Sequence, residues 1–112
     1  MHIYANKHLP SFNDFSEKEE IDLAIILKTL MMKFDNLFGF IFPYIMSIHQ
    51  QPTNGTGKEY SHFHIEFYPP YRTKDKLKYL AGSEIGAGTF INNTLPEEKA
   101  LELRNALPEE VV

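Results

Sequence analysis

The stretch Tyr60-Ser-His-Phe-His-Ile-Glu-Phe-Tyr-Pro-Pro70 carries the strongest structural signal in this sequence. Apolar and polar side chains alternate along it, which is typical of a β-strand with one buried face, because successive side chains point to opposite sides. The polar face would present His62, His64 and Glu66, with alternate residues about 7 Å apart at a rise of roughly 3.3 Å per residue. Two consecutive prolines end the strand, since proline cannot donate a hydrogen bond to a neighbouring strand.

The segments before this strand predict a helix and two further strands. A capping box that begins at Ser16 precedes apolar residues at helical spacing, which predicts a long helix over residues 17–37. Loose alternation predicts a short strand over residues 2–7, and aromatic and branched residues predict another over 40–50. Glycine and asparagine in residues 51–58 predict the turn before the central strand.

The segments after the central strand predict mostly helix. Residues 74–80 read as a short helix, and the glycines of 82–88 as a close-packed or mobile segment. A second capping box that begins at Thr94 predicts a helix over residues 95–106. The fold expected is therefore α+β: one antiparallel sheet with a long helix on one face and a C-terminal helix, in a single domain over residues 1–112.

Composition limits the classes of function. The chain has 112 residues and a net charge of −4. Because it has no cysteine, disulfides and thiolate metal sites are excluded. The basic residues are scattered, which argues against a nucleic-acid-binding protein. No apolar run approaches the ~18 residues that span a bilayer, and the first residues lack a secretory signal. We therefore expect a cytoplasmic protein that does not bind membranes.

Three side chains of the predicted sheet form a candidate metal site. His49 ends the strand that precedes the central one, so it could lie beside His64 and Glu66 in an antiparallel pair. Two imidazoles and a carboxylate suit a divalent transition metal such as zinc or iron. The alternative is a solvated sheet face, or buried histidines that only form hydrogen bonds.

The other three histidines of the chain are expected to lie outside this set. A metal rarely takes every polar side chain on one strand, so His62 need not be a ligand. His2 and His8 have no neighbouring metal-binding residues in the sequence and are expected to be ordinary surface residues.

The alternating histidines also resemble those of the histidine-triad nucleotide-binding proteins. In that family the middle histidine attacks an α-phosphate, which would make His64 the nucleophile of a stand-alone nucleotide hydrolase. The third histidine of the pattern is Glu66 here, and a carboxylate is poorly suited to meeting a phosphate. The resemblance therefore favours the superfamily more than independent catalysis by this strand.

Five segments in order resemble the C-terminal half of galactose-1-phosphate uridylyltransferase, a member of the histidine-triad-like superfamily. Together they cover nearly the whole chain. The segments are Phe34-Asp-Asn-Leu-Phe38, Phe42-Pro-Tyr-x-Met46, His64-x-Glu66-Phe-Tyr-Pro-Pro70, Lys78-Tyr-Leu-Ala-Gly82 and Thr94-Leu-Pro-Glu-Glu-Lys-Ala100.

The resemblance implies a nucleotidyltransferase of galactose metabolism. Enzymes of this family exchange uridylyl groups between UDP-glucose and galactose 1-phosphate, and they are usually homodimers. Their nucleophile is carried by a His-Pro-His motif in the N-terminal half, and this sequence contains no such motif. We therefore expect a C-terminal domain without its N-terminal half, inactive by itself. The alternative is a non-catalytic module that binds a sugar phosphate or a metal.

The resemblance also assigns roles to individual residues. It makes His49, His64 and Glu66 ligands of the family's second metal, zinc or iron, with a fourth ligand from the missing half.

A second set of residues falls at the family's sugar-phosphate positions. Lys78 would contact the phosphate and Glu84 the sugar hydroxyls, and Asn92 stands near the position of a family glutamine. The alternative for Lys78 and Glu84 is an exposed pair without a partner.

Overall fold

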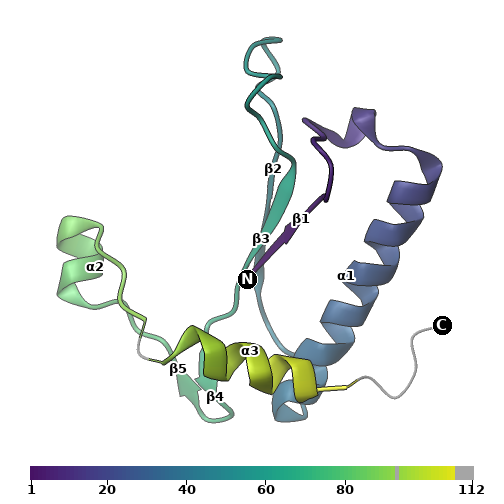
Figure 1. The fold of residues 1–112 in the computed structure, drawn as a ribbon. Helices are drawn as coiled ribbons and strands as arrows, with labels where there is room; N and C mark the ends of the chain where they lie inside the picture. Colours follow the sequence, from purple (N-terminus) through teal and green to yellow (C-terminus); the bar gives the residue numbers. More distant parts are fainter. Residues whose placement is uncertain (93, 108–112) are drawn as a thin grey trace. The chain divides into compact units, whose positions relative to one another are not determined.

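The computed structural model describes residues 1–92 and 94–107, which form two compact units. One unit combines Met1–Leu27 with Tyr44–Pro69, and the other combines Lys28–Pro43 with the described residues from Pro70 onward. The long helix α1 contributes its first half to one unit and its second half to the other (Figure 1). Helices and antiparallel sheets together confirm the predicted α+β class.

The first unit contains a three-stranded antiparallel sheet in the order β1-β3-β2, visible in Figure 1. Its strands are β1 (His2–Tyr4), β2 (Ile45–His49) and β3 (His64–Tyr68). All three were expected, but each is shorter than the sequence predicts. Residues 40–44 are not strand, because the N–H of Phe42 bonds to a side chain and Pro43 has no N–H.

The central strand begins later than predicted because the preceding residues form a turn. The N–H groups of Tyr60 and Ser61 both donate to the carbonyl of Gly57, at 3.3 and 2.8 Å, and so are not available to a ladder. The turn predicted over residues 51–58 is confirmed, with positive φ at Gly55 (80°) and Gly57 (78°).

The alternation along β3 creates one buried and one polar face, as predicted. Phe63, Ile65 and Phe67 are only 1–2% exposed and are the largest fully buried side chains. Phe12, in the short 3₁₀ helix η1 (Phe12–Asp14), and Phe15 pack on the ring of Phe63, with centroids 4.5 and 4.9 Å away. The intervening side chains therefore point away from the core.

Helix α1 (Glu17–Phe38) has nearly the predicted bounds. The predicted capping box is present: the N–H and hydroxyl of Ser16 donate to Glu19 at 2.8 and 2.7 Å, and the hydroxyl accepts from the N–H of Glu19 at 3.4 Å. Gly39, with φ of 74°, ends the helix by adopting the left-handed conformation. Neither this helix nor any other in the described ranges is long and apolar enough to cross a bilayer.

In the second unit the predicted helix over residues 74–80 is wrong. The chain instead forms a hairpin of β4 (Tyr71–Thr73) and β5 (Lys76–Leu77). A seven-residue helix is marginal by itself. The aromatic Tyr71 and the β-branched Thr73 instead favour the strand β4, which precedes a tight turn. The glycine-containing segment that follows was expected to be close-packed or mobile, and it forms the short helix α2 (Gly82–Ala87).

The C-terminal helix α3 (Pro96–Asn105) is confirmed, but its predicted capping box is not. The residue that precedes the helix is Leu95, and the hydroxyl of Thr94 bonds to Asn92 instead. Proline in the first turn is sufficient to start the helix because its φ is already helical. At the other end, the ammonium of Lys33 donates to the carbonyls of Leu103, Arg104 and Ala106 at 3.1, 2.9 and 3.4 Å.

Candidate functional site

The polar face of the first sheet gathers side chains from all three of its strands. In the β2–β3 ladder His49 lies opposite His64, and Ser47 lies opposite Glu66. In the β1–β3 ladder His2 lies opposite Glu66. Residues directly opposite in an antiparallel pair share a face, so these side chains converge on the side away from the core.

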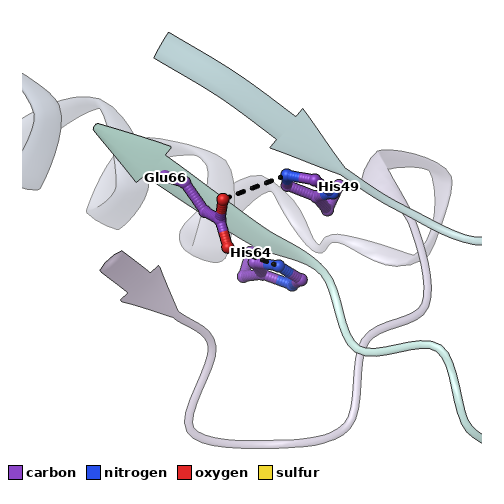
Figure 2. A group of neighbouring side chains, drawn as sticks. All are labelled: His49, His64 and Glu66. Atoms are coloured by element: carbon purple, nitrogen blue, oxygen red, sulfur yellow. Dashed lines mark ion pairs between the residues drawn. The ribbon is translucent and has the colours of Figure 1, made fainter. Parts of the chain in front are cut away.

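His49, His64 and Glu66 lie close enough together to share one metal ion. The Nε2 atom of His49 is 3.4 Å from Oε2 of Glu66, and Nε2 of His64 is 3.5 Å from Oε1 (Figure 2). One donor atom from each residue lies within 4.8 Å of the other two. The three side chains are 47%, 25% and 16% exposed, so the site is open to solvent on the side of His49.

Each nitrogen–oxygen separation is close to the spacing of two donors around a tetrahedral ion, although the two imidazoles approach different oxygens of Glu66. Donors bound at roughly 2.0–2.1 Å in a tetrahedron lie roughly 3.3–3.4 Å apart. The histidine tautomer also fits, because Nδ1 of His64 is 2.8 Å from the carbonyl of His62, which can only accept. A neutral His64 therefore directs its unprotonated Nε2 toward Glu66, the arrangement that metal-binding histidines use. Two acceptors facing each other need a cation between them, either a metal or a proton.

The carboxyl group of Glu66 is held in its charged form. The hydroxyl of Tyr68 donates a hydrogen bond to it, which lowers the pKa of Glu66, and nearby imidazoles lower it further. The same bond raises the pKa of Tyr68. Glu66 is consequently held as an anion, as a metal ligand must be.

Two further residues of this face were not expected at the site. The prediction that His2 has no metal-binding neighbours is wrong: this exposed residue has its Nδ1 3.6 Å from Oε1 of Glu66. Tyr68, two residues after Glu66 on the same face, was not singled out. The sequence contained a signal for both residues. His2 begins the alternating segment 2–7, and Tyr68 continues the alternation of His64 and Glu66 along the central strand.

The remaining two histidines lie outside the triad. His62 is within reach of the carbonyl of Ala5, with Nε2 at 2.9 Å, and His8 bonds to the carbonyl of Ser61 at 2.7 Å. Both rings therefore tie loop segments together through the backbone.

The second unit pairs Lys78 with Glu84, two of the predicted substrate residues. Nζ of Lys78 is 2.7 Å from Oε2 of Glu84 and 2.8 Å from the carbonyl of Ile91. The side chains are 19% and 2% exposed, so they are not the exposed, unpartnered pair that was the alternative. The third residue, Asn92, is exposed and bonds to the hydroxyl of Thr94 at 3.3 Å.

Glu84 is fixed by a backbone contact as well as by the lysine. Its Oε1 accepts from the N–H of Ala81 at 3.1 Å, at the start of α2. The ammonium of Lys78 and this N–H lower the pKa of Glu84, which keeps a nearly buried carboxylate charged.

The α+β fold, with an antiparallel sheet and a histidine-bearing polar face, is consistent with the histidine-triad-like class. A comparison with family models identifies the family within this class. The chain belongs to the family described as galactose-1-phosphate uridyl transferase, C-terminal domain, whose model matches residues 2–111.

Relatives and solved structures agree with this assignment. The chain is 43% identical over 105 residues to the galactose-1-phosphate uridylyltransferase of Thermotoga maritima, which covers 93% of this chain and 33% of the relative. It is also 43% identical over 106 residues to the galactose-1-phosphate uridylyltransferase of Saccharomyces cerevisiae, and this match covers 92% of this chain and 29% of the relative. A solved structure titled "Structure of uridylyltransferase" matches with a TM-score of 0.84 and 38% identity, covering 94% of this chain and 33% of that one. The chain thus spans about a third of the length of these relatives.

Proposed function

We propose that residues 1–112 are the C-terminal domain of a UDP-glucose–hexose-1-phosphate uridylyltransferase. In this proposal the domain supplies a metal site at His49, His64 and Glu66 and part of the pocket for a sugar phosphate. The observation that carries the proposal is the donor triad, whose ligand atoms lie within 4.8 Å of one another, in a chain whose family match extends over residues 2–111.

A zinc or iron ion held by the triad would supply positive charge between the imidazoles and the carboxylate. The residues of this chain would hold the ion and connect it to the sheet. His49 comes from β2, and His64 and Glu66 come from β3, so a shared ion joins the two strands. Three protein ligands leave one position for water or for a residue from another part of the enzyme.

The second unit offers opposite charges to a sugar phosphate. The ammonium of Lys78 suits a phosphate, and the carboxylate of Glu84 accepts hydrogen bonds from sugar hydroxyls. The two side chains already form an ion pair at 2.7 Å, so in this proposal a sugar phosphate would contact the pair from the more exposed side of Lys78. Asn92, whose amide is exposed, is proposed as an additional contact.

The full reaction needs residues outside this chain. Uridylyl transfer by double displacement uses a nucleophile that we place in the other half of the enzyme. His64 is a poor candidate because its Nε2 faces the carboxylate of Glu66 at 3.5 Å, which would repel a phosphate. We further propose a homodimeric, cytoplasmic holoenzyme that acts on UDP-hexose and galactose 1-phosphate.

Elemental analysis of the purified chain tests the metal site. We expect about one equivalent of zinc or iron, lost when His49→Ala and His64→Ala are combined. His8→Ala is the matched control, because His8 lies outside the triad and should leave the metal content unchanged. Absence of metal from the wild-type chain after incubation with excess zinc would overturn the metal site.

Thermal unfolding with galactose 1-phosphate tests the second unit. The ligand should raise the melting temperature, galactose alone should raise it less, and Lys78→Ala should abolish the shift. Lys74→Ala removes an exposed cation from the neighbouring hairpin and should preserve it. An equal loss in both variants would indicate nonspecific charge attraction and contradict the assigned role.

A further inference from the structure

Among the described residues, four side chains approach the carboxylate of Glu66 closely, and two of them belong to the metal triad. His49 and Tyr68 approach Oε2, and His64 and His2 approach Oε1. Each oxygen is therefore shared between one candidate ligand and one residue outside the ligand set.

Tyr68 contacts Glu66 from the same strand. The two residues are separated by one position on β3, so their side chains leave the same face. The phenol donates a hydrogen bond to Oε2 and keeps its proton, and a protonated phenol is a poor metal ligand. Tyr68 consequently acts on the carboxylate, whose side chain would otherwise rotate freely about its terminal bond.

His2 contacts Glu66 from the opposite edge of β3. It lies directly across the ladder from Glu66, with Nδ1 3.6 Å from Oε1 and 2.7 Å from the hydroxyl of Tyr4. Its ring is nearly parallel to that of His64, at 9° and a centroid distance of 6.3 Å. His2 therefore borders both the carboxylate and one of the imidazoles of the triad.

We propose that Tyr68 and His2 are positioning residues that hold the carboxylate of Glu66 in the orientation required for a shared metal ion. The inference rests on the proposed metal site and deepens it. Outer partners of this kind fix the direction of a ligand without binding the metal, and their loss typically weakens metal binding by about 10–100-fold.

Zinc affinity, measured by competition with a chromophoric chelator on the full chain, tests the proposal. Tyr68→Phe removes only the hydroxyl, and His2→Phe keeps a ring beside His64 but removes both ring nitrogens. Each should raise the Kd for zinc by about 10-fold or more. Tyr60→Phe is the matched control, since Tyr60 is 73% exposed in the turn before β3 and should leave the Kd unchanged.

A second readout separates positioning from general loss of stability. Cobalt in place of zinc gives visible bands that report ligand geometry, and these should shift in Tyr68→Phe while the melting temperature of the metal-free chain changes little. Wild-type Kd values and cobalt bands in both variants would overturn the inference and leave the triad intact. An iron(III)–phenolate absorption band lost in Tyr68→Phe would also overturn it, because Tyr68 would then be a ligand. If the wild-type chain binds no metal, the proposed site itself fails.

Discussion

The imidazole of His49 lies parallel to that of His64 across the β2–β3 ladder, with ring centroids 4.6 Å apart and planes 4° apart. The two residues are brought together by strand register alone. A slip of one residue would turn every side chain of the strand to the other face and separate the pair. The register is held by the buried face of β3, so the core and the candidate metal site depend on the same alternation.

Ile65 is the residue through which this dependence is best tested. It is 1% exposed and lies between His64 and Glu66 in the sequence, on the opposite face. Ile65→Ala should destabilise the fold by roughly 2–5 kcal/mol, because it leaves a cavity in a packed core. Urea unfolding followed by circular dichroism measures the change.

Ile48→Ala is the control for this prediction. Ile48 lies directly opposite Ile65 on β2 but is 42% exposed, so its truncation should cost much less. Equal losses in the two variants would mean that the buried face of β3 does not hold the sheet.

The capping box of α1 should make stability depend on acid pH. Hydrogen bonds from Lys7 and Ser16 lower the pKa of Glu19 from 4.5 to about 2. A carboxylate with a lowered pKa in the folded state contributes stability above its unfolded pKa, and this contribution is lost as the pH falls toward the folded value. Glu19→Gln should therefore destabilise the chain at pH 7 and have little effect near pH 2.

Unfolding midpoints at a series of pH values between 7 and about 2 measure this effect. Glu20→Gln is the control because Glu20 is exposed in the same turn of α1, and its effect should be small throughout. A difference between Glu19→Gln and wild type that does not shrink with falling pH would contradict the assigned pKa.

Lys33 should stabilise the C-terminus of α3. Its ammonium donates to three carbonyls, two of them in the last turn of the helix, where a positive charge also complements the helix dipole. Lys33→Met should reduce the free energy of unfolding by about 1.5–3 kcal/mol, the range for hydrogen bonds to a charged group. The exposed Lys74, changed to methionine, should cost less than about 0.5 kcal/mol in the same urea titration. A loss of unfolding free energy for Lys33→Met no larger than that for Lys74→Met would show that these contacts do not stabilise the chain.

Features with a local cause were predictable from the sequence. The alternation of β3 gave its buried face, and the register of one hairpin was enough to place His49 beside His64. The start of α1 followed from the spacing of Ser16 and Glu19, whose bonds close within one turn.

Features that depend on pairing between distant segments were not predictable in this way. The approach of His2 to Glu66 requires the register between β1 and β3, which join residues 64 positions apart. The hairpin of β4 and β5 was predicted as a helix because neither pattern is strong in so short a segment. The ion pair of Lys78 and Glu84 depends on α2, whose glycines disfavour a helix in isolation.

The most direct test of the central claim is anomalous diffraction at the zinc absorption edge from crystals of the zinc-loaded chain. We predict one strong peak bonded to Nε2 of His49, Nε2 of His64 and a carboxylate oxygen of Glu66, at about 2.0–2.2 Å from each. A peak bound only by other side chains, or none at this face of the sheet, would contradict the account.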